Sequence, residues 1–200
     1  LVQYLVKKSK NFIKSDRMVY PNLITYWNFS HIVLCATLAK AAYNKKVEIY
    51  VDTVLYSKLT SSPYQPCFYI ATKGDSLFVI IRGTKGSDDL FTDYDYRTVK
   101  TPYGNFHTGF YKAATYIMGY AKSYIQTWNG PVFCVGHSMG ACVSTVVSVI
   151  CRKELPGANV NCIAIAPAPS IDVYNYDNNG KIASFVNGND IAPTLSVENC

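Results

Sequence analysis

The sequence has 200 residues, which suits one domain with a substantial core, and its 49% hydrophobic and 16% charged residues exclude a disordered chain. No apolar run reaches the roughly 18 residues that a membrane-spanning helix needs, so we do not expect an integral membrane protein. The net charge is only +6, the basic residues after position 17 are scattered and no recognition motif is present, which argues against nucleic-acid binding.

The first 17 residues are the most basic part of the chain, and apolar residues recur among them at roughly helical spacing. The basic residues are Lys7, Lys8, Lys10, Lys14 and Arg17. We predict a basic amphipathic arm over residues 1–17, which packs on its own domain or makes peripheral contact with an anionic membrane surface, the first being favoured. The chain does not begin with Met and has no signal-peptide pattern, so we expect a processed or partial chain whose targeting cannot be read.

The seven cysteines show neither CxxC nor Cys/His ligand spacing, so we expect no metal site and no cofactor. Cys134, Cys142 and Cys162 lie in apolar segments and are interpreted as small buried hydrophobic residues. This pattern favours a reducing, intracellular compartment and leaves disulfides open.

Helical and strand patterns alternate along most of the chain. Helices are predicted over residues 22–43, 108–128 and 139–154, with a weaker one near 173–175. Strands are predicted over residues 67–73 and 76–83, which form a hairpin around Gly74-Asp75, and over 131–136, 160–168 and 181–190. Because the strands are apolar throughout, we predict one α/β domain over residues 1–200, a mostly parallel sheet with helices on both faces.

Ser138 lies in Gly136-His137-Ser138-Met139-Gly140, a G-x-S-x-G sequence between a predicted strand and a predicted helix. A chain that turns sharply there leaves no room for side chains at the two flanking positions, which explains both glycines. The serine Oγ is then exposed above the sheet at a helix N-terminus, which favours developing negative charge. The pattern predicts a nucleophile, and the alternative is a purely structural glycine-rich turn.

Four blocks of sequence resemble the class 3 lipase family of α/β-hydrolases, and most of all its diacylglycerol lipase-like branch. They appear in the family's order over about residues 66–196. The blocks are "VIIRGTKGSDDLFTDYDY", "HTGFYKAA", "FCVGHSMGA" and "SFVNGNDIAPTLS". The resemblance implies an α/β-hydrolase fold and a lipid ester as substrate.

The resemblance also implies roles for single residues. Ser138 would attack an ester carbonyl and form an acyl-enzyme. The backbone N–H groups of Thr84 and Met139 would form the oxyanion hole, since these residues follow the Arg-Gly pair and the nucleophile. Asp190, just after the last predicted strand, would orient the catalytic histidine. A loop aspartate bonded to its own turn is the alternative.

Two further aspartates, Asp172 and Asp177, are weaker candidates for the acid because they do not follow so clear a strand. The segment between Thr84 and Tyr96 would be the lid hinge. Gly86 and Ser87 would give it freedom, and Leu90 and Phe91 could line an acyl groove. Asp93 matches a family position that is better read as structural than catalytic.

The chain has three histidines, and none matches the family's catalytic base. His137 adjoins the nucleophile and would point away from it, His107 matches a structural position, and His31 lies in an early apolar helix. The family's order places the base after Asp190, where no histidine remains. We therefore expect the C-terminal part of the fold, with the catalytic histidine, beyond Cys200 on a further segment or a second chain.

The leading hypothesis is a serine esterase or lipase that cleaves acylglycerols or phospholipids through an acyl-enzyme. The alternative is a catalytically inactive hydrolase-fold protein that binds lipid or a protein partner. A histidine after Asp190 in the full-length sequence would favour the enzyme. Acyl transfer to an alcohol would use the same residues and is not distinguished by sequence.

Overall fold

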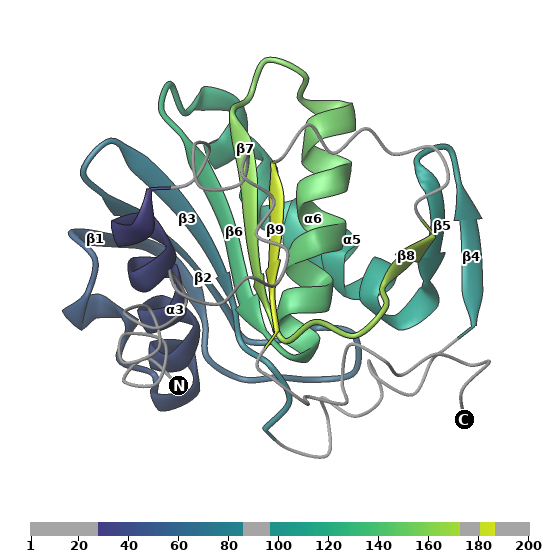
Figure 1. Ribbon diagram of the computed structural model, residues 1–200, viewed down its shortest axis with the longest axis horizontal. Coiled ribbons are helices and arrows are strands. Elements are labelled where there is room, and N and C mark those ends of the chain that lie inside the picture. The colour runs from purple at the N-terminus through teal and green to yellow at the C-terminus, as the bar shows by residue number, and fades with distance from the viewer. Residues whose placement is uncertain (1–27, 86–96, 173–180, 187–200) are drawn as a thin grey trace, which may run out of the picture.

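The computed structural model describes residues 28–85, 97–172 and 181–186, which form two sheets and three helices (Figure 1). The larger sheet has strand order β1-β2-β3-β6-β7-β9. Its strands are β1 (Thr53–Lys58), β2 (Phe68–Lys73), β3 (Ser76–Ile81), β6 (Val132–His137), β7 (Val160–Ile165) and β9 (Ile182–Phe185). The helices are α3 (Phe29–Asn44), α5 (Thr108–Thr127) and α6 (Met139–Glu154), with a 3₁₀ turn η1 (Val47–Ile49).

The large sheet is parallel from β3 to β9 and antiparallel from β1 to β3. The predicted hairpin is confirmed: β2 and β3 pair up to Lys73 and Ser76, and Gly74 turns between them with φ +58°. The predicted mostly parallel sheet is confirmed as well. The strand predicted over 160–168 ends earlier, at Ile165, because Ala166 adopts φ +50° and leaves the extended conformation.

Helices cover both faces of this sheet, as predicted. Alternate residues of each central strand enter two separate clusters, so that Leu77 and Val79 of β3 pack on the side of α5 and α6, while Phe78 and Ile80 pack on the side of α3. Both sets are fully buried. The strands read as continuous apolar runs because each face has its own helix to pack against.

The helix boundaries follow the sequence pattern closely. α6 covers the predicted 139–154, and α5 ends one residue before the predicted 128. The first helix, predicted from residue 22, instead begins at Phe29, because Asn28 is extended (φ −68°, ψ 126°) and its side chain accepts a hydrogen bond from the Ser30 N–H at 3.0 Å and caps α3. Residues 22–27 of the predicted first helix, and the weak helix near 173–175, lie outside the described residues.

A second, three-stranded antiparallel sheet was not predicted. It consists of β4 (Thr98–Thr101), β5 (Gly104–His107) and β8 (Ile171–Asp172), and Figure 1 shows it at the right, beyond α5 and α6. Its strands are short, and in β4 and β5 only Phe106 is buried, so they carry little apolar pattern. Asp172, the weaker acid candidate, is paired with Asn105 in this sheet.

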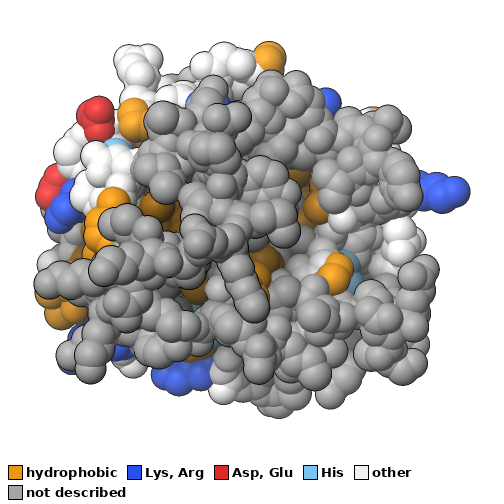
Figure 2. All heavy atoms as spheres, viewed as in Figure 1, with side chains coloured by type: hydrophobic (Ala, Val, Ile, Leu, Met, Phe, Trp, Pro, Cys, Tyr) orange, Lys and Arg blue, Asp and Glu red, His pale blue; other side chains and the backbone are white. Residues whose placement is uncertain are grey.

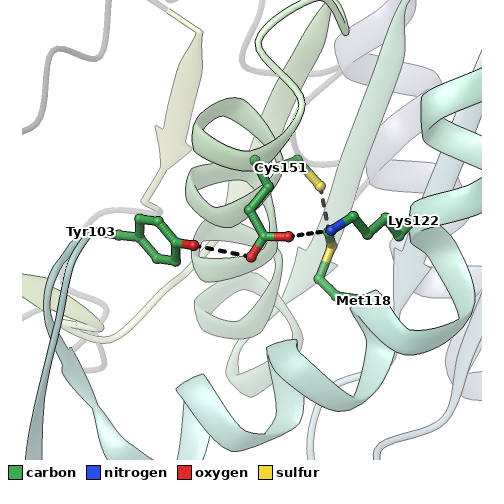
Figure 3. A network of polar contacts seen from close by, with 5 residues as sticks. Tyr103, Met118, Lys122 and Cys151 are labelled. Atoms are coloured by element: carbon green, nitrogen blue, oxygen red, sulfur yellow. Dashed lines mark hydrogen bonds and ion pairs between the residues drawn. The ribbon is translucent and has the colours of Figure 1, made fainter.

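A polar network ties this sheet to the two helices (Figure 3). The Tyr103 hydroxyl, between β4 and β5, donates to the Glu154 carboxylate at 3.2 Å, and Lys122 of α5 pairs with the same carboxylate at 2.7 Å. Glu154 ends α6 and Ser138 precedes it. The network therefore lies about 24 Å from the elbow along the helix, at 1.5 Å per residue.

The surface in Figure 2 shows Lys and Arg side chains at separate places around the margin, among the residues the structure describes. No helix within the described ranges is long and apolar enough to cross a membrane.

Candidate active site

Ser138 connects β6 to α6 in a backbone conformation that side-chain-bearing residues rarely adopt, with φ +56° and ψ −129°. Its N–H donates to the Ile165 carbonyl at 2.9 Å, which fastens the turn to the end of β7. Serine commonly caps a helix through its hydroxyl, yet the Ser138 side chain makes no cap hydrogen bond. The half-buried hydroxyl is thus left for other chemistry at the helix N-terminus.

Both flanking glycines are required by close backbone contacts. A Cβ on Gly136 would lie 2.2 Å from the Gly140 carbonyl group, and a Cβ on Gly140 would lie 2.3 Å from the Ile81 carbonyl oxygen. Real Cβ atoms essentially never approach backbone so closely. The predicted collision of side chains with helix and strand is therefore present in the structure.

The loop after β3 packs against the same turn. β3 and β6 are parallel neighbours in which Ile81 is paired with Gly136, so the segment 82–84 leaves the sheet beside the elbow. A Cβ on Gly83 would come within 2.4 Å of the His137 carbonyl oxygen. The structure thus brings Thr84, which is half-buried, to the same edge as Met139, which is buried.

Buried Arg82 anchors the start of this loop. Its guanidinium donates to the Ser61 hydroxyl at 3.0 Å, and its backbone N–H donates to the Cys67 carbonyl at 3.0 Å. Both contacts hold the base of the loop, which keeps the position of Thr84 tied to the sheet.

The loop after β7 completes the described part of the site, and sequence reasoning did not single it out. Ala166 has φ +50°, and its N–H donates to the Phe185 carbonyl at 2.8 Å. The Ala168 N–H lies 3.2 Å from the Cys142 sulfur of α6. The segment "APAP" after an apolar strand was the available signal, since two prolines stop a strand there.

Each histidine has a place in the fold. His137 Nδ1 lies 3.0 Å from the Tyr43 hydroxyl, and His107 Nδ1 accepts a hydrogen bond from the Phe110 N–H and caps α5. The His31 ring packs on Phe133, with centroids 5.2 Å apart. His107 is therefore structural, as expected.

The described cysteines, including Cys134, Cys142 and Cys162, are buried and form no disulfide with one another, which confirms their interpretation as core residues. Burial raises the pKa of Cys162 and Cys151 to about 12, so both thiols are neutral at physiological pH. Within residues 28–85, 97–172 and 181–186, no group of three or more His, Cys, Asp or Glu side chains could hold a metal ion.

Comparison with known protein families identifies the family of this chain. The sequence model described as "Lipase (class 3)" matches residues 78–200, more than half of the chain. The chain belongs to the class 3 lipase family. A search of curated proteins found no match.

Solved lipase structures share the fold of this class 3 lipase. The Rhizomucor miehei triacylglyceride lipase matches with a TM-score of 0.72 and 16% identity over 85% of this chain and 75% of that one. The lipase from Rhizopus microsporus var. chinensis matches with a TM-score of 0.69 and 14% identity over 91% and 71%. A triacylglycerol lipase whose catalytic centre is described as a serine protease triad matches with a TM-score of 0.69 and 14% identity over 85% and 75%. These likenesses establish an α/β-hydrolase fold.

Several predicted site residues of this class 3 lipase lie outside the described residues. They are Asp190, Asp177, Gly86, Ser87, Leu90, Phe91 and Asp93. The described part therefore holds the elbow, the loop after β3 and the loop after β7. All three follow parallel strands, whose carboxyl ends form the usual ligand-binding edge of an α/β sheet.

Proposed function

We propose that this member of the class 3 lipase family is a serine hydrolase that cleaves carboxylic esters through an acyl-enzyme on Ser138. The observation that carries the proposal is the elbow itself: a serine at φ +56° with no capping bond, between two glycines that cannot be replaced without collision. Strain of this kind costs about 1–3 kcal/mol and clusters at active sites. A merely structural turn would gain nothing from placing a serine there.

The proposed reaction has two steps. Ser138 Oγ attacks the ester carbonyl carbon while its proton passes to a histidine, which we place after Cys200 and which Asp190 would orient. The tetrahedral intermediate collapses, the alcohol leaves with that proton, and the acyl group stays on Oγ. Water then attacks the acyl-enzyme with the same base, which releases the carboxylic acid and restores the serine.

The oxyanion formed in each step would be held by the backbone N–H groups of Thr84 and Met139. The paired register of β3 and β6 supports this assignment, because it places both residues just beyond the same edge of the sheet. Met139 is also the first residue of α6, where the helix N-terminus favours negative charge. Loss of one such donor typically costs about 3–4 kcal/mol of barrier stabilisation.

We propose acylglycerols as the substrate class, with phospholipids as the further candidate. The support is the family together with the matched structures, two of which are described as lipases of triacylglycerides or triacylglycerols. Leu90 and Phe91 would line the acyl groove, with Gly86 at the lid hinge. Peripheral contact of the basic residues 1–17 with an anionic lipid surface stays the less favoured alternative to packing on the domain.

A fluorophosphonate probe tests the proposal with the full-length protein. We expect one probe equivalent on Ser138 and hydrolysis of a triacylglycerol emulsion, and both should be lost in Ser138→Ala. Ser148→Ala is the matched control, because that serine is buried in the same helix and donates to the Thr145 carbonyl at 2.8 Å. A protein that stays unlabelled and hydrolyses no ester would overturn the proposal.

The second candidate is an inactive hydrolase-fold protein that binds lipid or a protein partner. The observation that favours it is that all three histidines have other roles: a bond to Tyr43, a helix cap and a ring contact. It predicts binding of a fluorescent fatty acid without turnover, and no labelling of Ser138. Activity of the full-length protein would exclude it.

A further inference from the structure

Tyr43, in the last turn of α3, contacts the elbow through the His137 side chain and the loop after β3 at Gly83. Its hydroxyl lies 3.0 Å from Nδ1 of His137, and the two rings meet edge-on with centroids 5.8 Å apart. The same hydroxyl lies against Gly83, since a Cβ there would come within 2.0 Å of it. In Figure 1 the C-terminal end of α3 lies at the same end of the molecule as the start of α6. One side chain therefore links α3, the elbow and the loop after β3.

The backbone of Tyr43 makes a further contact with the same loop. Lys85 Nζ donates to the Tyr43 carbonyl oxygen at 2.8 Å. Thr84 therefore lies between two residues that both contact Tyr43, Gly83 through the hydroxyl and Lys85 through the carbonyl. The loop that carries one proposed donor is held on both sides by this tyrosine.

We propose that Tyr43 is a positioning residue that sets the spacing between the N–H groups of Thr84 and Met139. The inference rests on the proposed function, because the spacing matters only if the chain stabilises an oxyanion. Both donors must lie about 2.7–3.1 Å from that oxygen. Tyr43 meets this need because its hydroxyl touches the elbow and the loop at once.

The hydroxyl, rather than the ring, carries this role. When the His137 imidazole is neutral with its proton on Nε2, Nδ1 accepts a hydrogen bond from the Tyr43 hydroxyl. This bond holds the ring of the residue that precedes the strained Ser138. Phenylalanine would keep the ring packing and lose the bond. A displacement of about 1 Å can cost on the order of 100-fold in rate, so a small relaxation of the elbow would be visible in kcat.

The test compares Tyr43→Phe with Tyr103→Phe in the full-length protein. Tyr103 is the matched control, since its hydroxyl also makes one hydrogen bond, to Glu154 at the far end of α6. For a soluble p-nitrophenyl ester we expect Tyr43→Phe to lower kcat about tenfold and to change KM by less than about twofold. The rate of fluorophosphonate labelling should fall by a similar factor. Tyr103→Phe should leave both rates unchanged.

A double-mutant cycle with His137→Leu locates the effect. If Tyr43 acts through His137, the double variant should lose little more activity than the more severe single variant. If the two substitutions instead lower kcat by independent factors that multiply, the bond between Tyr43 and His137 does not carry the effect. Lys85→Met, a change at an exposed side chain, removes the other contact and should also lower kcat at constant KM, about threefold. An unchanged kcat in Lys85→Met would show that the contact between Lys85 and the Tyr43 carbonyl does not position Thr84.

The outcomes separate this inference from the proposed function. A wild-type protein that neither reacts with the probe nor hydrolyses the ester refutes the function. An active wild-type protein whose Tyr43→Phe variant keeps its kcat refutes the inference alone. A parallel loss of melting temperature and of both kinetic constants in Tyr43→Phe would show a merely structural role and would also refute it.

Discussion

At the scale of single residues, the elbow concentrates constraints that a sequence pattern can reveal. Ser138 keeps its positive φ because its N–H is bonded to Ile165 and its neighbours have no side chains to collide. The G-x-S-x-G motif indicates this close packing directly, since a side chain at either glycine would collide with backbone atoms. This is why the strained turn at Ser138 could be predicted from a five-residue pattern.

Gly140→Ala and Gly119→Ala should have opposite effects on stability. A Cβ on Gly140 would meet the Ile81 carbonyl oxygen at 2.3 Å, so backbone must shift, and we expect a loss of about 3 kcal/mol or more. Gly119, within α5, has nothing within 4 Å of its Cβ position, and alanine should gain about 0.5–1 kcal/mol there. Urea unfolding of both variants measures this. Equal effects would contradict the steric account of the elbow.

Tyr43 shows where residue-level prediction stops. It ends "AKAAY" in a helix whose pattern indicates only burial, and its partners are 40 and 94 positions away. The local sequence pattern cannot predict these long-range contacts, because they form only when α3 packs beside the ends of β3 and β6. Asp190, the lid residues and the histidine after Cys200 stay predictions, as does the diacylglycerol lipase-like branch.

At the scale of elements, α3 ends in a Schellman motif whose left-handed residue is Lys45, at φ +53°. The Lys45 N–H donates to Ala42 and the Lys46 N–H to Ala41. Lys45→Gly should therefore raise the free energy of unfolding by about 1 kcal/mol, because glycine adopts this conformation without a Cβ penalty. Thermal unfolding checks the gain.

The neighbouring lysine provides the control for that prediction. Lys46 has φ −127°, so Lys46→Gly relieves no strain and should be neutral or destabilising. A more stable cap leaves Tyr43, in the same final turn, in its place, so Lys45→Gly should leave kcat unchanged. Equal gains in both variants would show that the left-handed conformation is not the source of the stability.

The elements that the sequence predicted are those that bury continuous apolar surface. β3, β6, β7 and α6 were found because most residues of each strand, or a full helical stripe, are apolar and buried. β1 was missed because it alternates between exposed and half-buried residues at the edge of the sheet. β4, β5 and β8 were missed for a different reason: they are only two to four residues long and pair with one another in a separate sheet.

At the scale of the whole molecule, the fold separates the candidate site from its main surface network. The loops after β3, β6 and β7 meet at one edge of the sheet, while Glu154 lies at the opposite end of α6. Changes in the network of Tyr103, Lys122 and Glu154 should thus affect stability and leave hydrolysis intact. This separation makes the network a clean probe of pH-dependent stability.

The hydrogen bond from Lys122 lowers the pKa of the Glu154 carboxyl below its usual 4.5, with a smaller effect of the Tyr103 hydroxyl. A group whose pKa is lowered on folding stabilises the fold above its unfolded pKa and loses that contribution as pH falls through the folded value. Wild type should thus exceed Glu154→Gln in stability at pH 7, and the gap should close progressively below about pH 4.5. Since both side chains are partly exposed, 1 M salt should narrow the gap as well. Urea unfolding from pH 3 to 7 measures the gap, and one that stays constant across that range would show that Glu154 gains nothing from its charge.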